Sequence, residues 1–154
     1  MQYTYEAIFT AEEEGGYSVN FPDIDGCWTC GDDYADAIFM AADALTLVLR
    51  SAELDEESIP PATFKHPLGE RDERVVISVI TDEAQVFITT AYAAEVLGVS
   101  AGRVRQLVAN GQLPAKKRGR DYMVDYAAVK ERVANPPKAG RVKAVAPAQE
   151  AKAA

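Results

Sequence analysis

Short stretches of alternating apolar and polar residues dominate the first thirty positions of the chain. Aromatic and β-branched side chains predict strands over residues 3–10, 17–21 and 27–30. The Gly-Gly pair at 15–16 suits a hairpin turn, because glycine adopts positive φ without a steric cost. The Pro-Asp-Ile-Asp-Gly stretch at 22–26 is typical of a second turn. The pattern therefore predicts three consecutive strands joined by short connections.

A helical period replaces this alternation after residue 33. Asp32 or Asp33 can cap the N-terminus of the helix, and Asp36 adds negative charge to its first turn, which the helix dipole favours. Apolar residues at helical spacing form the predicted core-facing row, which comprises Ile38, Ala41, Leu45, Val48, Leu49 and Ala52.

A loop and a fourth strand complete the first predicted unit. Residues 53–73 have no clear period and contain three prolines, so we expect a loop there. The β-branched run at 75–80 predicts a strand. The order β-β-β-α-β implies a sheet with one helix across one face, and we place this domain at residues 1–82. A domain of this size is marginally stable alone, so we expect a homodimer or a higher homo-oligomer.

Two short helices open the second half of the chain. Thr89 or Thr90 caps the first helix and Gly98 ends it, while Ser100 caps the second and Gly111 ends it. Two such helices joined by a tight turn with glycine form the helix-turn-helix pattern. The residues expected to face inward are all apolar: Ala93, Ala94, Leu97, Val104, Leu107 and Val108.

A small hairpin and a third helix follow, and we place this second domain at residues 86–133. Residues 115–118 and 122–125 can pair around Gly119, and the third helix begins near Asp125. The residues expected on the inner side of that helix are Val129 and Val133.

The end of the chain differs in composition from both domains. Residues 134–154 hold three prolines and no aromatic residue, which predicts a disordered tail. The chain as a whole is therefore predicted to be of the α+β class, with a β-β-β-α-β unit followed by a helix-turn-helix domain that carries a hairpin wing.

Charge divides the chain in the same way. Residues 1–85 hold 19 Asp and Glu against 4 Lys and Arg, a net charge of −15, whereas residues 86–154 hold 5 against 12, a net charge of +7. The basic half can approach nucleic acid, and the acidic half would be repelled by nucleic acid and would favour a basic partner.

The basic residues concentrate on the second helix of the helix-turn-helix and on the hairpin. That helix enters the major groove in such domains, where Arg can pair with guanine and Gln with adenine. Lys and Arg on a neighbouring hairpin would attract phosphates, and a hydroxyl at the helix start can bind one. The candidate DNA-binding residues are Ser100, Arg103, Arg105, Gln106 and Asn110 on the helix and Lys116, Lys117, Arg118 and Arg120 on the hairpin.

This second domain resembles the excisionase and MerR-type winged-helix family. The matching motifs are ITTAYAAEVLGVS, RVRQLVANGQLPA and GRDYMV, which begin at positions 88, 103 and 119. Tyr92 stands where the family often has a Glu that closes a capping box, and Gly102 occupies a position often taken by a larger polar residue. The resemblance implies a DNA-binding winged helix-turn-helix.

The first domain resembles the HicB antitoxin family. The residues that carry this resemblance are EGGYSVNFPDIDGCWTCGDD at 14–33, followed by ADAIFMAADALTLVL at 35–49. The family has a partial RNase H-like fold of β-β-β-α-β order and neutralises HicA, a small basic toxin that cleaves mRNA. Many members also carry a C-terminal DNA-binding domain that represses their own operon. The resemblance therefore implies an antitoxin that binds a HicA-type toxin and double-stranded operator DNA.

The residues that would contact a toxin are chosen from the second predicted turn and the strand after it. Asp23 and Asp25 offer negative charge in the turn, and Trp28 offers a large apolar surface at the start of the strand. A buried core position explains Trp28 equally well.

Other chemical signals in the sequence favour ordinary structural roles. Cys27 and Cys30 form a C-x-x-C without a second ligand pair, and positions three apart on a strand point to opposite faces, so we expect structural cysteines that stay reduced. His66 lies in the predicted loop as a plain surface residue. Asp32 and Asp33 suit a helix cap and, with Asp23 and Asp25, would otherwise invite a metal-dependent nuclease. The predicted sites are therefore not catalytic, and no metal or cofactor is expected.

Two alternatives to the antitoxin hypothesis remain open at this point. A free-standing transcription regulator would use its first domain for oligomerisation or ligand sensing, and an active nuclease would use the Asp residues. No apolar run is long enough to cross a bilayer, and the first ten residues do not form a secretory signal. We therefore expect a cytoplasmic protein without a membrane partner.

Overall fold

A computed structural model describes residues 1–82 and 84–138 of the chain. From position 139 onward, the predicted tail lies outside the described residues. The domain boundaries at 1–82, 86–133 and 134–154 stay a prediction. Backbone contacts divide the described chain into two compact units, which are Met1–Phe87 with Asp125–Ala127, and Ile88–Val124 with the described residues from Ala128 onward.

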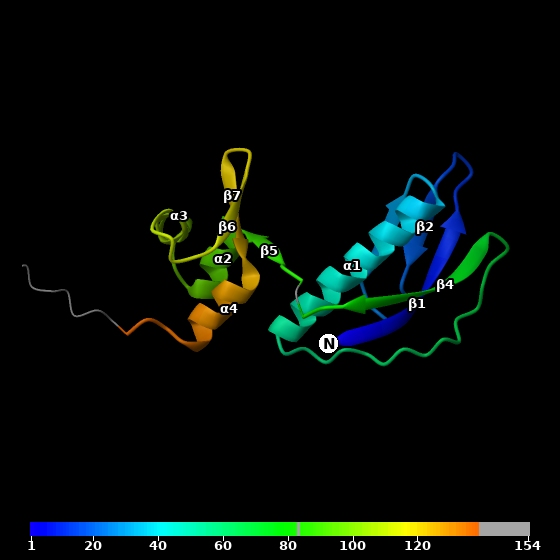
Figure 1. The fold of residues 1–154 in the computed structure, drawn as a ribbon, viewed down its shortest axis with the longest axis horizontal. Helices are drawn as coiled ribbons and strands as arrows, with labels where there is room; N and C mark the ends of the chain where they lie inside the picture. Colours follow the sequence, from blue (N-terminus) through cyan, green and yellow to red (C-terminus); the bar gives the residue numbers. More distant parts are fainter. Residues whose placement is uncertain (83, 139–154) are drawn as a thin grey trace, which may run out of the picture. The chain divides into compact units, whose positions relative to one another are not determined.

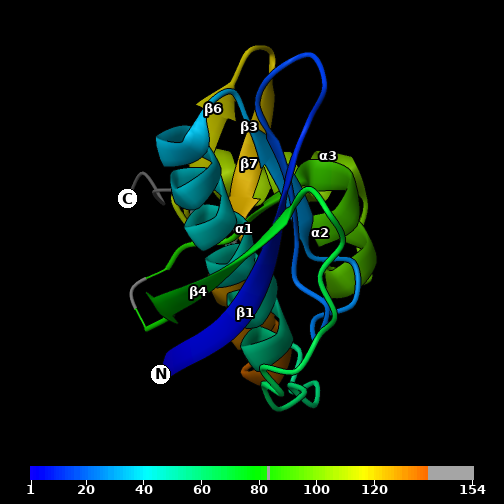
Figure 2. The ribbon, with the colours of Figure 1, turned by 90° about the vertical axis from the view of Figure 1, so that its right-hand side faces the viewer.

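The first unit is a four-stranded antiparallel sheet with one long helix on it. Its strands are β1 (Gln2–Ala11), β2 (Tyr17–Asn20), β3 (Trp28–Gly31) and β4 (Asp72–Ile80), arranged in the order β3-β2-β1-β4. Helix α1 (Tyr34–Leu54) lies across one face of this sheet (Figures 1 and 2). The predicted β-β-β-α-β order and the α+β class are both confirmed.

The core of the first unit lies between α1 and the covered face of the sheet. Alternate residues of the strands, among them Phe9, Val19 and Ile77, point into it because successive side chains of a strand point to opposite faces. The helix supplies a straight row at intervals of four, made of Ala37, Ala41, Leu45 and Leu49.

The predicted row on α1 was partly wrong. Ile38 is 37% exposed, because it lies about 100° around the helix from Ala37, which occupies the buried position instead. Phe39 and Leu47 lie on the solvent side of α1 and are 69% and 39% exposed. The helix therefore carries exposed apolar residues as well as buried ones.

The first turn of α1 approaches the end of β3 very closely. The side chain of Asp33 caps the helix by accepting a hydrogen bond of 2.8 Å from the Asp36 N–H. A Cβ atom added at Gly31 would lie 2.3 Å from the backbone nitrogen of Ala37, so only glycine fits at that point of the strand. The close approach of the helix to the sheet at this point therefore depends on Gly31.

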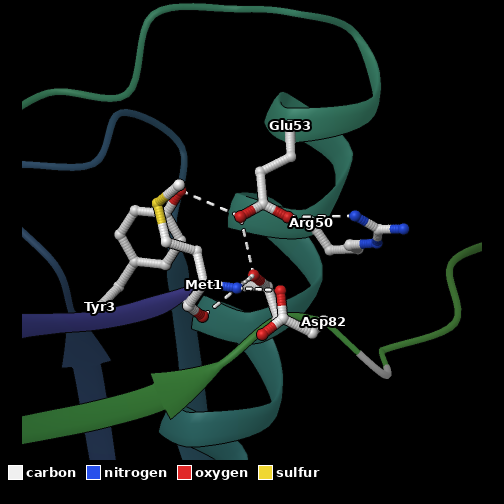
Figure 3. A network of polar contacts seen from close by, with 6 residues as sticks. Met1, Tyr3, Arg50, Glu53 and Asp82 are labelled. Atoms are coloured by element: carbon white, nitrogen blue, oxygen red, sulfur yellow. Dashed lines mark hydrogen bonds and ion pairs between the residues drawn. The ribbon is translucent and has the colours of Figure 1, made fainter.

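The far end of α1 is held by a network of polar groups (Figure 3). Glu53 accepts hydrogen bonds from the Tyr3 hydroxyl at 2.9 Å and the Thr81 hydroxyl at 2.7 Å, and it pairs with Arg50 at 3.1 Å. Burial opposes ionisation of Glu53, but these three donors outweigh it, so the pKa of Glu53 lies below its ordinary value. The network connects the helix to the ends of β1 and β4.

The second unit contains the predicted helix-turn-helix and hairpin. Helices α2 (Thr90–Leu97) and α3 (Ala101–Ala109) are followed by strands β6 (Ala115–Arg118) and β7 (Asp121–Asp125) and by helix α4 (Tyr126–Ala134). The predicted caps are confirmed, because Thr89 accepts a hydrogen bond from the Tyr92 N–H and Gly98 adopts φ +65° at the end of α2.

The sequence missed one strand in this unit. Strand β5 (Phe87–Thr89) pairs beside β7, so the hairpin belongs to a three-stranded sheet of order β5-β7-β6. Three residues are too few to show a period of two, which explains why the pattern did not reveal it. Val104, Leu107 and Val129 are buried as predicted, whereas Val133 is 49% exposed.

Two leucines on α1 provide a test of this packing. Leu45 is fully buried, so Leu45→Ala should lower the free energy of unfolding by about 2–5 kcal/mol through reduced burial and a cavity. Leu47→Ala is the matched control on the solvent side and should cost less than about 1 kcal/mol. Denaturant titration followed by circular dichroism measures both, and equal losses would contradict the assignment of the helix faces.

Candidate functional site

The exposed face of α3 carries the side chains predicted to read DNA. Arg103, Arg105 and Gln106 are all exposed, while Val104 and Leu107 between them are buried, so the helix presents one polar face and one apolar face. Arg103 donates a hydrogen bond of 3.2 Å to the Gln106 side chain one turn away. The structure thus places these candidates on one surface.

The two ends of α3 hold the remaining predicted residues of this helix. The Ser100 oxygen accepts a hydrogen bond of 3.1 Å from the Arg103 N–H, so it serves as the helix cap. The hydroxyl proton of Ser100 stays available to a phosphate. Asn110 is exposed at the C-terminal cap of α3.

The predicted hairpin is formed by β6 and β7, and Figure 1 shows it projecting from the rest of the unit. Gly119 adopts φ +61° in its turn, as the prediction requires. The four basic side chains of this hairpin are all exposed, and they are Lys116, Lys117, Arg118 and Arg120.

One ion pair connects the hairpin to α3. Arg105 lies 3.6 Å from Asp121, whose backbone faces Arg118 across the hairpin. Both side chains of the pair are largely exposed, at 52% and 71%, so the pair adds little stability but orients the Arg105 guanidinium. The hairpin and the polar face of α3 therefore form one basic surface.

A second candidate surface is the face of the first sheet that α1 does not cover. Trp28 is 74% exposed there, so the core position that the sequence allowed for it is wrong. It borders a hollow of about 230 Å³ with Ile8 of β1 and Asn20 of β2. A large exposed aromatic side chain beside a hollow is a common feature of protein interfaces.

Asp23 occupies a different environment from the one the sequence suggested. Only 7% of its side chain is exposed, and its two oxygens accept hydrogen bonds from the N–H and the hydroxyl of Thr63, both at 2.9 Å. The Nε2 atom of His66 also lies 2.9 Å from the carboxylate. Asp23 therefore holds a neighbouring segment in place and offers little surface to a partner, whereas Asp25 is exposed.

The segment from Thr63 to His66 crosses the uncovered face as a strap. It is bound to Asp23 beyond β2 at one side, and the His66 carbonyl accepts a hydrogen bond of 2.6 Å from Arg74 of β4 at the other. Between them, Glu6 of β1 is fully buried, and its carboxylate lies 3.0 Å from the Arg74 Nε as an ion pair without hydrogen-bond geometry.

The sequence missed the strap because its contacts join residues that are far apart along the chain. His66 contacts Asp23, which lies 43 positions earlier in the chain. The expectation of a plain surface histidine was therefore wrong. No local period marks such a contact. The prolines that border the segment predicted irregular structure, but they did not indicate which residues the segment contacts.

The two cysteines of the C-x-x-C lie in different environments. Cys27 is buried and Cys30 is exposed, and both are free thiols. Burial raises the pKa of Cys27 to about 11, so its thiol is unreactive at neutral pH. Among residues 1–82 and 84–138, no group of three or more His, Cys, Asp or Glu is placed to hold a metal ion. In the same part of the chain, no helix combines the length and apolarity needed to cross a membrane.

The Asp23 contacts predict a dependence of stability on pH. Burial opposes ionisation, but the hydrogen bonds from Thr63 and His66 outweigh it, so the pKa of Asp23 in the folded chain lies below its ordinary value of 3.8. The resulting stability is fully present above about pH 4 and is lost as the pH falls through the folded pKa.

Asp23→Asn tests this dependence. The variant should lose about 1–3 kcal/mol of unfolding free energy at pH 7, because Thr63 and His66 lose a charged acceptor. The difference from the unmodified chain should shrink below pH 4. Asp25→Asn, two positions away on an exposed side chain, is the control and should leave the unfolding curve unchanged. A constant deficit for Asp23→Asn at every pH would argue against the role of its charge.

Comparisons with known proteins match each unit to a family model. Residues 5–85 match the model of the HicB-like antitoxin of bacterial toxin-antitoxin systems, and this match spans more than half of the chain. Residues 87–135 match a helix-turn-helix domain model. The two matches cover the sheet unit and the helix-turn-helix unit respectively.

Two curated proteins are similar to this chain. Antitoxin HicB 1 of Photorhabdus laumondii subsp. laumondii is 39% identical over 75 residues, which cover 49% of this chain and 46% of that protein. The UPF0150 protein Ta0767 of Thermoplasma acidophilum is 34% identical over 56 residues, which cover 36% of this chain and 81% of that protein. The chain thus matches less than half of the length of the Photorhabdus protein.

Two solved structures are also similar. A toxin-antitoxin complex from Streptococcus pneumoniae contains a chain that is 14% identical, with a TM-score of 0.49, and the match covers 72% of this chain and 99% of that one. A HicA3 and HicB3 toxin-antitoxin complex contains a chain that is 25% identical, with a TM-score of 0.38, and the match covers 51% of this chain and 96% of that one.

Proposed function

The chain belongs to the HicB-like antitoxin family, and from this premise we propose that it neutralises a protein toxin and represses its own operon. The toxin is of the HicA type, which cleaves mRNA, and the repression acts through operator DNA. The observation that carries the proposal is the presence, in one chain, of a HicB-like unit and a helix-turn-helix unit with opposite net charges. In this proposal residues 1–82 bind the toxin and residues 86–133 bind DNA.

The toxin docks on the uncovered sheet face around Trp28. The exposed indole supplies the apolar anchor, and the hollow beside it can receive a side chain of the toxin. Asp25 and the other carboxylates of the acidic half attract a basic protein and speed its association. Asp23 contributes by holding the strap that borders this surface.

DNA binds to the surface formed by α3 and the β6-β7 hairpin. Arg103, Arg105 and Gln106 face the major groove and contact base edges, and Ser100 binds a phosphate at the helix start. The basic hairpin lies along the phosphate backbone, where its four cations supply attraction that does not depend on sequence. Asn110 contacts DNA at the other end of the helix.

The opposite charges keep the two functions on separate units. The net charge of −15 over residues 1–85 repels phosphates, so DNA contacts are confined to the second unit. The same charge favours a cationic toxin over nucleic acid. One chain can therefore hold a toxin and an operator at the same time.

A pull-down from the native cells tests the antitoxin function. The tagged chain should recover a small, basic protein in near-stoichiometric amount, and that protein should arrest growth when it is expressed alone. Recovery of the chain with only itself and DNA would instead support a free-standing transcription regulator.

Trp28→Ala should weaken binding of the recovered toxin by about 30-fold or more, because loss of a central aromatic anchor costs about 2 kcal/mol or more. Titration calorimetry measures this change. Phe39→Ala is the matched control, since Phe39 is a similarly exposed aromatic residue on α1, and it should leave toxin affinity unchanged. Equal effects of the two variants would place the toxin elsewhere.

Replacement of the four basic residues of the hairpin with Ala should weaken DNA binding and reduce its salt dependence. The slope of log K against log salt becomes shallower by about 0.9 for each phosphate that the hairpin no longer neutralises, or about 3.6 for all four. Toxin affinity should not change. The control removes two exposed cations of the first unit by Lys65→Ala and Arg71→Ala and should leave the slope as it was. The variant residues of the hairpin are Lys116, Lys117, Arg118 and Arg120.

A further inference from the structure

Strand β4 is an exposed edge of the first sheet. It is nine residues long and pairs with β1 on one side, while no other described strand pairs with it on the other. The backbone groups along that side therefore have no strand to bond with. A long edge of this kind invites pairing with another chain unless charge, proline or a bulge blocks it.

The β4 edge lacks those protective features over most of its length. The run from Val75 to Ile80 contains neither a charged residue nor proline. Val76 and Ile80 are 55% and 64% exposed on the uncovered face, with the exposed Ser78 between them. Apolar side chains thus extend along this edge and face solvent.

We infer that β4 pairs antiparallel with β4 of a second copy of this chain, about a two-fold axis at Ser78. In this register Val76 faces Ile80 of the other copy, and Ser78 faces its own counterpart. Both contacts lie on the uncovered face, because residues an even number of positions apart share one face of a strand. The two sheets join into one sheet of eight strands.

Charge supports the same register. Each end of the pairing brings Arg74 toward the turn just beyond β4 of the other copy, and this turn contains Asp82. Arg74 is 41% exposed although it contacts Glu6 and His66, and its guanidinium has further donors. Asp82 is 72% exposed where it pairs with the N-terminal amine. A pairing centred on Val76 would instead place Ile80 opposite Asp72 and leave these charges unmatched.

The acidic character of the unit does not prevent this association. Exposed charges separated by more than about 8 Å are largely screened at physiological salt, and the paired segment itself is neutral over six residues. A foreign strand could pair with the same backbone, but a second copy supplies Ile80 and Ser78 in the order that matches Val76 and Ser78.

The dimer has a consequence for DNA binding that rests on the proposed function. Two joined chains carry two helix-turn-helix units, as recognition of a two-fold symmetric operator requires. Loss of the pairing should then weaken operator binding while each unit still binds DNA non-specifically. A chain that pairs through β4 but binds no operator would refute the DNA function and leave this inference intact.

Cysteine cross-linking on the full-length chain tests the axis directly. In a Cys30→Ser background, which removes the exposed native thiol, Ser78→Cys should form a disulfide-linked dimer when a mild oxidant such as diamide is added. The control is Asn20→Cys, on the same face but two strands away from the edge, and it should remain uncross-linked. Failure of Ser78→Cys to cross-link above this control would overturn the inference.

A charge pair introduced across the interface tests the register. Val76→Glu places a carboxylate opposite Ile80 of the other copy and should reduce cross-linking of Ser78→Cys by about tenfold or more. Adding Ile80→Lys to the same chain should restore it, because each new carboxylate then faces a new ammonium of the other copy. Within one chain these positions are about 13 Å apart, so a local salt bridge cannot explain the rescue.

Circular dichroism must show that Val76→Glu still folds, which the exposure of Val76 leads us to expect. Restoration by the double variant supports the register centred on Ser78. Cross-linking that Val76→Glu leaves unchanged would overturn it. So would a double variant that cross-links as poorly as the single one.

Discussion

The close packing of α1 on the end of β3 is the constraint on which the first unit depends. Gly31 leaves no room for a Cβ atom beside the backbone of Ala37, so the close approach of the helix to the sheet requires glycine at this position. From there the row through Ala41, Leu45 and Leu49 follows the sheet and covers one of its faces. A single helix can cover only one face of a sheet, so the opposite face must meet solvent, the strap or a partner. The proposed binding surface of this unit is therefore a result of its packing and does not depend on a separate binding element.

The strap divides the uncovered face into two regions of different character. It is held at one side by Asp23 and at the other by Arg74, and it buries Glu6 beneath it. One region contains Trp28 and its hollow, and the other contains the exposed Val76 and Ile80 of β4. Burial of the Glu6 carboxylate lowers the stability of the fold unless a cation compensates its charge. Arg74 forms the ion pair with it, so Arg74 must stay close to Glu6. The strap thus couples the position of the β4 side chains to the position of the loop next to Trp28.

The sequence predicted the elements better than it predicted their contacts. Local patterns were sufficient for the four strands of the first unit, the helix caps at Asp33, Thr89 and Ser100, and the hairpin around Gly119, because each depends on residues within a few positions. The placement of Ile38 was wrong, since a period of 3.6 residues allows two adjacent apolar rows and only the packing chooses between them. The bond between Asp23 and His66 could not be predicted, because it depends on how a loop without a period folds back. The exposure of Trp28 depended on which face of the sheet the helix covers, and the local pattern does not contain that information.

The order of the strands decides whether dimerisation and toxin binding can occur together. Trp28 is on β3 and the proposed dimer contact is on β4, and these are the two opposite edges of the sheet. Three strand spacings, about 14 Å, separate them, and the strap lies between. A second copy that extends the sheet at β4 therefore adds its strands away from the Trp28 hollow. In the proposed dimer, two toxins could then bind at the two far ends of the eight-stranded sheet, and each chain would keep its own proposed docking surface. The geometry thus favours an assembly with equal numbers of both proteins over one in which dimerisation competes with neutralisation.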